Sequence, residues 1–328
     1  MSGFSYIRAG SFEEASKEVK SGAGKSLLKA GGVDVLDRIK EHLEAPERLV
    51  SILGIESARA IELRPDGSAS IGALATMTEI AEHPGLRQRF PALATAAGSV
   101  GTPAIRNAAT LGGNLCQRPR CGYFRSELFP CRRKGGAECF AIVGDHRMHA
   151  IYDNSLCAAV LAPSTAAPLV ALGAELVIGA AGQKPRRIKA EELFLASSED
   201  LRREVRLDPG EIIERVEVPA GIWRSAYARA TPRDSFDWPM VEVAAALLAE
   251  KSGIEDVRII LGSVAMTPRR ALEAEKLLRG KAPSISVIEA AAQAATVGAT
   301  PLPGNRYKLS VASAMVARAL GAALEGLV

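Results

Sequence analysis

The spacing of hydrophobic and polar positions predicts short helices and short strands in alternation over the first third of the chain. Apolar residues at helical spacing over residues 12–19 indicate an amphipathic helix, with Ser11 as its N-cap. Aliphatic runs bounded by turn residues are typical of strands. Strands are expected at residues 26–30, 49–52, 60–63 and 70–73, and further helices at 34–40, from 78 onward and at 90–97. Because the two kinds of element alternate, an α+β layered fold is favoured over an all-helical one.

The second half of the chain continues this mixture with longer elements. Alternating residues at 212–218 and aliphatic runs at 241–248 and 257–262 predict three strands, and residues 311–324 predict a helix. At 328 residues, the chain exceeds the roughly 250 to 300 residues at which a single core usually stops growing. Two or more domains are therefore expected.

Composition and charge narrow the classes of function. The formal charge of +4 comes from 41 basic and 37 acidic residues, a balance that does not favour a nucleic-acid binder. Apolar runs stay well below the roughly 18 residues of a membrane span, so no membrane span is expected. The start at Met1 lacks the charged, apolar and small-residue order of a signal peptide. We expect a cytoplasmic protein, or one that a partner carries out of the cytoplasm.

Two glycine pairs are candidates for a cofactor site. Gly31 and Gly32 stand between a predicted strand and a predicted helix, where glycines allow backbone amides to approach an anion closely. This pattern predicts a pyrophosphate cradle, although such a pair is also common in plain turns. The motif is neither GxGxxG nor a P-loop, so a standard Rossmann site is disfavoured.

The second pair, Gly112 and Gly113, follows about 80 residues later. One extended dinucleotide lying between the two loops would explain both pairs. Alternatively, the second pair is a bulge or tight bend between buried strands.

All five cysteines lie within residues 116–157. The four later ones are separated by nine, seven and seventeen residues, without the close C-x₂₋₄-C knuckles of zinc fingers, and only Cys116 and Cys121 form a C-x₄-C pair. Disulfides are an option outside the cytoplasm, but a chain of this size does not need them. Four thiolates on a basic, glycine-containing segment would suit a [4Fe–4S] cluster. The residues alone leave cluster, zinc site and unliganded thiols open.

Short motifs in a fixed order along nearly the whole chain carry a family resemblance. They are residues 30–36 (Ala-Gly-Gly-Val-Asp-Val-Leu), 110–115 (Thr-Leu-Gly-Gly-Asn-Leu), 162–164 (Ala-Pro-Ser) and 304–308 (Gly-Asn-Arg-Tyr-Lys). Together they resemble the FAD-binding subunit of the xanthine dehydrogenase and molybdenum hydroxylase family. The segments 120–125 (Arg-Cys-Gly-Tyr-Phe-Arg), 130–131, Cys139 and 147–150 (Arg-Met-His-Ala) are similar to one branch of it. That branch contains periplasmic aldehyde oxidoreductases and, more distantly, 4-hydroxybenzoyl-CoA reductases, whose flavin subunit carries an extra [4Fe–4S] cluster.

The resemblance implies an α+β protein with two domains. Residues 1–220 would form a two-part FAD-binding domain of the vanillyl-alcohol-oxidase or PCMH type, with the cysteine-rich insertion at about 116–157. Residues 221–328 would form a smaller α/β domain of the CO-dehydrogenase flavoprotein type, and the boundary would lie near Pro219-Ala220-Gly221.

The resemblance also implies the site residues, position by position. Residues of the first loop would hold the FAD diphosphate, and later motifs would contact the cofactor further along. The expected FAD-binding residues are Lys29, Ala30, Gly31, Gly32, Val33, Asp34, Val35, Leu36, Asn107, Thr110, Gly112, Gly113, Asn114, Ser164 and Arg229. The expected cluster ligands are Cys121, Cys131, Cys139 and Cys157, whereas Cys116 is expected to be a small buried hydrophobic residue.

Several positions depart from the family pattern. Val33 replaces a hydroxyl residue, Thr165 stands where the motif has an acid, and Arg229 takes the place of a lysine. The segment Phe236-Asp237-Trp238 replaces a more aliphatic sequence, so the tuning of the flavin is expected to differ.

Some polar residues near the cysteines have more than one interpretation. His146 and His149 would either tune the cluster or serve as ordinary surface or packing histidines. The basic run over residues 118–134 would be a docking surface, a charge screen for the cluster or a solvated loop face.

The expected function is that of an electron-transfer flavoprotein subunit in a heterotrimer. Substrate, an aldehyde, purine or aromatic compound, would be oxidised at the molybdenum cofactor of a large partner subunit. Electrons would pass through two [2Fe–2S] clusters on a small partner subunit to FAD in this chain, and then to an external electron acceptor. No catalytic acid or base is expected in this chain. The competing hypothesis is a zinc-stapled binding or scaffold module without redox activity.

Overall fold

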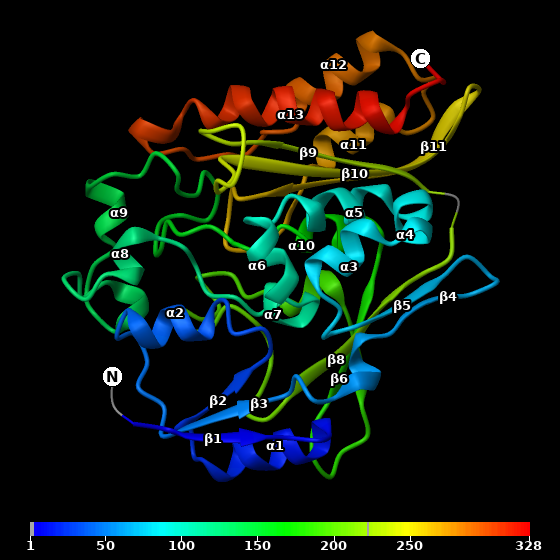
Figure 1. Ribbon diagram of the computed structural model, residues 1–328. Helices are drawn as coiled ribbons and strands as arrows, with labels where there is room; N and C mark the ends of the chain where they lie inside the picture. The colour runs from blue at the N-terminus through cyan, green and yellow to red at the C-terminus, as the bar shows by residue number, and fades with distance from the viewer. Residues whose placement is uncertain (1–2, 222) are drawn as a thin grey trace.

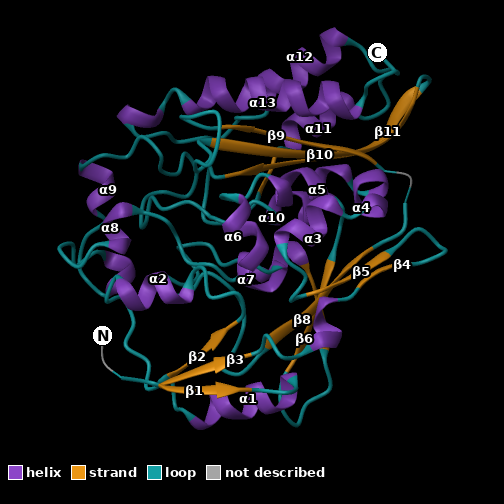
Figure 2. Ribbon diagram, viewed as in Figure 1, coloured by secondary structure: helices purple, strands orange, loops and turns teal. Residues whose placement is uncertain are grey.

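The computed structural model describes residues 3–221 and 223–328, and these form three sheets with helices packed between and around them (Figure 1). The mixture of helices and strands confirms the α+β prediction. Figure 2 shows helices between the central and C-terminal sheets and along the outer face of the C-terminal sheet, with α1 (Phe12–Ser21) beside the N-terminal sheet and α2 (Val35–Lys40), α8 (Gly122–Arg125) and α9 (Phe140–Val143) at the left of the view. In the described ranges, no helix has the length and apolar character needed to cross a membrane.

The N-terminal layer is a parallel sheet with strand order β1-β3-β2. Its strands are β1 (Ser5–Arg8), β2 (Ser26–Lys29) and β3 (Arg48–Ser51), and its helices are α1 (Phe12–Ser21) and α2 (Val35–Lys40). Helix α1 begins as predicted, because the Ser11 hydroxyl accepts a hydrogen bond from the amide of Glu14. The sheet directs the end of β2 into the first glycine loop.

The central layer is a five-stranded antiparallel sheet with order β4-β5-β8-β6-β7. Its strands are β4 (Ile61–Leu63), β5 (Ala69–Gly72), β6 (Glu175–Gly179), β7 (Arg186–Lys189) and β8 (Ile212–Val218). Its helices are α3 (Met77–Glu82), α4 (Pro84–Arg89), α5 (Pro91–Gly98), α6 (Pro103–Ala108), α7 (Leu111–Leu115) and α10 (Ala166–Ala171). The predicted strand at 212–218 is confirmed with the same bounds.

The C-terminal layer is an antiparallel sheet with order β12-β11-β10-β9, covered on its outer face by helices (Figure 1). Its elements are β9 (Arg224–Ala230), β10 (Val241–Glu250), β11 (Gly253–Gly262), β12 (Arg269–Arg270), α11 (Leu272–Leu278), α12 (Ile285–Ala294) and α13 (Lys308–Ala323).

Strand β10 divides two hydrophobic cores. Successive strand residues point to opposite faces. Ala244 and Ala246 therefore pack into the core of the central layer, whereas Val243 and Leu247 pack into the core beneath the C-terminal helices. Strand β10 thus contacts both cores. Residues on its face toward the central layer can reach the space between the two layers.

The cysteine-rich segment contains little regular structure. Its helices α8 (Gly122–Arg125) and α9 (Phe140–Val143) have four residues each. Arginine side chains connect the segment to other parts of the chain: Arg118 and Arg133 both pair with Glu204, and Arg125 pairs with Asp34. Ion pairs therefore hold this segment against the rest of the chain, whereas backbone hydrogen bonds between strands hold the sheets together.

Candidate cofactor pocket and cysteine cavity

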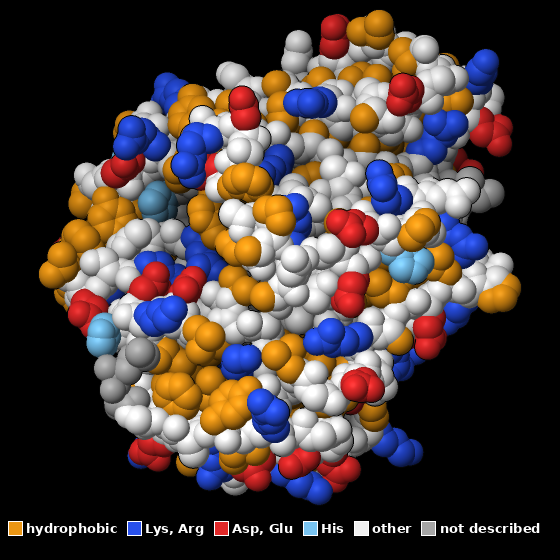
Figure 3. All heavy atoms as spheres, in the orientation of Figure 1, with side chains coloured by type: hydrophobic (Ala, Val, Ile, Leu, Met, Phe, Trp, Pro, Cys, Tyr) orange, Lys and Arg blue, Asp and Glu red, His pale blue; other side chains and the backbone are white. Residues whose placement is uncertain are grey.

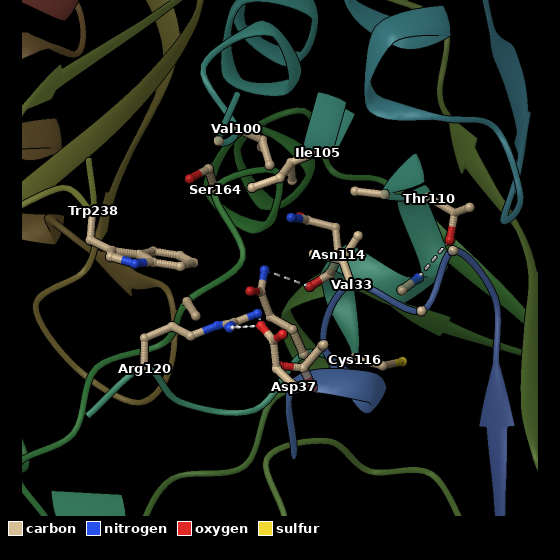
Figure 4. Close-up of a pocket in the computed structure, with 18 of the residues that line it drawn as sticks. Val33, Asp37, Val100, Ile105, Thr110, Asn114, Cys116, Arg120, Ser164 and Trp238 are labelled. Carbon is tan, nitrogen blue, oxygen red and sulfur yellow. Dashed lines mark hydrogen bonds and ion pairs between the residues drawn. The ribbon is translucent and has the colours of Figure 1, made fainter. Parts of the chain in front are cut away.

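A large cleft opens between the first glycine loop, helix α7 and the connection from β9 to β10. It encloses about 1210 Å³ of space, including its open mouth. Figure 4 shows its two ends, with Thr110 at one and Trp238 and Arg120 at the other. Both glycine motifs contribute to the walls, as expected if one extended dinucleotide lay between them.

The first glycine loop requires glycine at two positions, for different reasons. An added Cβ on Gly31 would lie 1.7 Å from the carbonyl oxygen of Ala108, and Gly32 has a φ of +85°, in the left-handed region that disfavours side chains. Gly31 therefore lets the first loop approach the chain that precedes the second glycine motif. The sequence requires glycine at both positions to build this wall of the cleft.

The second glycine pair lies in a short helix and not in a bend between strands, so the bulge interpretation is wrong. Thr110 caps helix α7, because its hydroxyl accepts a hydrogen bond from the amide of Gly113 at 3.2 Å. Buried Asn114 is fixed by Thr165, whose hydroxyl donates to the Asn114 side-chain oxygen at 2.7 Å. The departure at position 165 thus holds a pocket residue in place.

The structure places most of the expected FAD-binding residues on the cleft. Four expected residues do not line it. Lys29 folds back so that its amine donates to the Ala30 carbonyl, and the Asn107 side-chain oxygen accepts from Thr78. The residues on the cleft are Ala30, Gly31, Gly32, Val33, Asp34, Val35, Thr110, Gly113, Asn114, Ser164 and Arg229, and those off it are Lys29, Leu36, Asn107 and Gly112.

Two lining residues that the sequence did not predict are Arg120 and Trp238. The Arg120 guanidinium lies 5.1 Å from the centre of the Trp238 ring and pairs with Asp34 at 3.0 Å and with Asp37 at 3.3 Å (Figure 4). An arginine over an aromatic face gains a cation–π contact. The only sequence signal was the unusual aromatic character of residues 236–238.

Cys116 also lines the cleft and lies apart from the other cysteines. Burial raises the pKa of its thiol to about 12, so it remains protonated at neutral pH. Cys116 packs against the core of the central layer but is only partly buried, so its role as a small buried hydrophobic residue stays a prediction.

The four other cysteines line one small cavity. Cys121, Cys131, Cys139 and Cys157 share it with aromatic side chains and with Arg132 and Arg133. A hydrogen bond with Cys139, together with the positive charge of Arg133, lowers the pKa of the Cys157 thiol below its usual value. A largely buried guanidinium thus favours the thiolate that metal binding requires.

The donor set of this cavity is four thiols, the ligand type of iron–sulfur clusters. Over the part of the chain that the structure describes, no three His, Cys, Asp or Glu side chains are close enough to hold one ion. A cluster binds its four cysteines through different iron atoms, and their sulfurs therefore stay further apart.

The histidines near the cavity have different surroundings. A ring nitrogen of His149 lies 3.3 Å from the Cys121 sulfur, and burial lowers the His149 pKa to about 4. The ring of His149 is therefore neutral beside that thiol. His146 instead accepts a hydrogen bond from the Gly304 amide at 2.8 Å.

Two family models together span almost the whole chain. The first, described as the FAD binding domain in molybdopterin dehydrogenase, matches residues 2–221. The second, described as the CO dehydrogenase flavoprotein C-terminal domain, matches residues 226–323.

Curated relatives and solved structures match over similar lengths. The aldehyde oxidoreductase FAD-binding subunit PaoB of Escherichia coli K12 is 30% identical over 326 residues, covering 98% of this chain and 99% of the relative. The carbon monoxide dehydrogenase medium chain of Hydrogenophaga pseudoflava is 27% identical, covering 92% and 90%.

Among solved structures, carbon monoxide dehydrogenase from Hydrogenophaga pseudoflava superimposes with a TM-score of 0.75 at 26% identity, covering 98% of this chain and 96% of that one. Quinoline 2-oxidoreductase from Pseudomonas putida 86 gives a TM-score of 0.77 at 23% identity, covering 100% and 99%, and so shares the fold.

Proposed function

The chain belongs to the family of FAD-binding medium subunits of the xanthine dehydrogenase and CO dehydrogenase enzymes, and from this premise we propose that it passes electrons from partner subunits through FAD to an external acceptor. FAD, when bound, supplies the redox chemistry. The residues of this chain position it: Gly31 and Gly32 leave space for its diphosphate, and Asn114, Ser164 and Arg229 face the rest of the cleft.

A [4Fe–4S] cluster held by Cys121, Cys131, Cys139 and Cys157 is the second part of the proposal. One observation carries it: these four cysteines, without Cys116, line one cavity. Arg120 lines the FAD cleft, and the next residue, Cys121, lines the four-cysteine cavity. Consecutive Cα atoms are about 3.8 Å apart, so the two cavities adjoin along the backbone. Their closeness supports electron exchange between the two groups.

Serine variants at each cysteine test the cluster. Iron per flavin and the low-temperature EPR of the reduced protein would be measured for all five single variants. We expect Cys121→Ser, Cys131→Ser, Cys139→Ser and Cys157→Ser to lose the cluster, because each removes one iron ligand. Cys116→Ser is the matched control and should keep it.

Two outcomes would contradict this assignment in different ways. If Cys116→Ser empties the cluster while Cys157→Ser retains it, the ligand set is wrong. If no variant changes the iron content, this chain holds no cluster. A colourless protein with stoichiometric zinc would support the scaffold alternative, which the family membership does not favour.

The partners in the proposal are a large subunit with the molybdenum cofactor and a small subunit with two [2Fe–2S] clusters. Hydrophobic side chains gather on the surface where Figure 1 places α8 and α9 (Figure 3). Leu128 and Val143 in this region are 85% and 87% exposed. Obligate interfaces bury such apolar surface, so we expect the chain expressed alone to be poorly soluble or to lose flavin. A stable, fully flavinated monomer without affinity for co-expressed partners would contradict this assembly.

We propose domains of residues 1–220 and 221–328, to be tested by whether limited proteolysis cuts near residue 220 and leaves two resistant fragments. We propose a cytoplasmic complex, or a periplasmic one exported with a partner that bears a signal. Fractionation of cells that express the whole complex, with and without that partner's signal, distinguishes the two.

A further inference from the structure

A group of charged and polar side chains is buried directly behind the wall of the FAD cleft. Glu242 is 1% exposed and Lys308 is fully buried. Burying charged groups costs free energy unless they have partners, so such a group calls for an explanation. Neither residue lines the cleft or contacts one of the four cysteines.

The strand register explains how Glu242 reaches this position. Glu242 lies on β10 opposite Arg229 of β9 and Gly262 of β11, so the three share one face of the sheet. A Cβ on Gly262 would lie 2.5 Å from the Glu242 side chain, so glycine there makes room for the carboxyl. That face is the one that packs toward the FAD-binding domain.

This carboxyl lies next to residues of the cleft. The Tyr227 hydroxyl donates to Glu242 Oε2 at 2.5 Å, and Ser164 lies beside both residues. Ser164 and Arg229 line the FAD cleft. The carboxyl therefore adjoins two residues of the cofactor pocket, Ser164 and its register partner Arg229.

On the other side, the connection continues to Lys308. Ser263 Oγ donates to Glu242 Oε1 at 3.3 Å, and the Ser263 carbonyl accepts from Lys308 Nζ at 2.7 Å. Lys308 Nζ also donates to the His149 carbonyl at 2.9 Å. The amine is thus held near the carboxyl without a direct ion pair.

The pKa values of Glu242 and Lys308 are both shifted toward neutral pH. Burial raises the pKa of Glu242 to about 7 and lowers the pKa of Lys308 to about 7. The charged groups facing Glu242 are Arg229 from β9 and Lys308 from α13. The remaining titratable neighbour is Tyr227, whose pKa burial raises well above its usual value, so it stays a neutral phenol.

We propose that Glu242 is a proton-exchanging group of the flavin site, binding a proton when the cofactor in the adjoining cleft is reduced and releasing it on reoxidation. This inference rests on the proposed function, because it requires FAD in that cleft. Two electrons from the iron–sulfur centres of the partner subunits add negative charge to the cleft. Glu242 would bind one proton from solvent in response to that charge, in addition to one proton taken up by the reduced FAD, and both protons would return to solvent when the acceptor removes the electrons.

The test is the pH dependence of the flavin midpoint potential in the assembled complex. One proton per two electrons changes the potential by about 30 mV per pH unit, and two protons change it by about 59 mV. Above about pH 7, where oxidised Glu242 is ionised, we expect the native complex to approach the steeper slope. Glu242→Gln should keep the shallow slope throughout, and below that pH the two should agree.

Glu275→Gln is the matched control. Glu275 is also a fully buried carboxylate of the C-terminal layer, but it pairs with Arg270 and Arg279 and does not line the cleft. It should retain the native slope. A native slope in Glu242→Gln would overturn the proposal, as would an equal loss of slope in Glu275→Gln.

A second measurement does not depend on the variant folding. The infrared difference spectrum between oxidised and reduced native complex should contain a protonated-carboxyl band that shifts in D₂O. If reduction changes no such band, Glu242 does not bind the proton. Failure of the proposed function would look different, because the native complex would then have no flavin absorbance to titrate.

Discussion

The FAD cleft and the four-cysteine cavity lie next to each other but are built in different ways. The cleft depends on backbone positions: Gly31 sits against the Ala108 carbonyl, and Thr110 caps the short helix that carries Asn114. The cavity depends on side chains carried by a segment with two four-residue helices. Adding a side chain to a glycine should therefore damage the cleft. Replacing a cysteine side chain by another of similar size should damage the cavity.

The two sites meet at Asp34. This residue lines the FAD cleft, and its carboxylate pairs with Arg120 at 3.0 Å and with Arg125 at 2.7 Å, both from the cysteine-rich segment. It also pairs with Arg38 of its own helix at 3.0 Å. We therefore expect changes confined to one site to remove only that site's cofactor. A change at Asp34 should destabilise both sites together.

The largest effect is expected from a side chain added to the first glycine loop. Gly31→Val should abolish FAD binding, because the collision with the Ala108 carbonyl cannot be relieved without moving backbone. Gly32→Val should also lose flavin through its positive φ, although its added Cβ meets only flexible side chains. Flavin content after gentle purification is the measurement.

Gly321→Ala is a suitable control, since an added Cβ there meets nothing within 4 Å. It should retain full flavin. Full FAD occupancy in Gly31→Val and Gly32→Val would remove this loop from the site and end the comparison.

Removing iron should affect the cysteine-rich segment and spare the cleft. A chelator that strips the proposed cluster should leave FAD bound, while cleavage by trypsin within residues 116–157 becomes faster. The reason is that this segment has few backbone ladders and many basic residues. Loss of flavin in parallel with iron would show that the two sites form one unit.

Asp34→Asn should destabilise the whole domain by about 3 kcal/mol, because it leaves largely buried arginines without their shared partner. Denaturant unfolding measures this change. Asp145→Asn removes an exposed pair with Arg147 and should leave the unfolding midpoint unchanged. If the two variants behave alike, Asp34 does not connect the sites.

The smallest effect is expected at the cap of α7. Thr110→Val removes the hydroxyl that accepts from the Gly113 amide and should cost about 1 kcal/mol of stability together with some flavin affinity. Ser284→Ala removes the corresponding cap of α12, which lies away from the cleft. It should lower stability similarly and leave flavin affinity unchanged. Equal flavin affinities in the two variants would show that the Thr110 cap does not contribute to flavin binding.

The sequence by itself determined the local elements and the motifs. Helix α1 with its Ser11 cap and the strand at 212–218 follow from short-range patterns, and the structure has both. The glycine at position 31 could be assigned to a cofactor loop because its neighbours along the chain, a strand and a helix, define that loop. The choice of four cysteines out of five came from the family resemblance, since the spacing alone left it open.

Only the tertiary structure decided which distant residues meet. It placed Arg120 against Trp238, Thr165 against Asn114, and Cys116 in the FAD cleft. It also joined Glu242 to Lys308 through Ser263, and these two residues lie far apart in the sequence. Propensity and periodicity act over a few residues, whereas these contacts depend on strand register and on the packing of layers against one another. That packing results from the whole fold and not from any one motif. The surroundings of each site could therefore not be predicted from its motif alone.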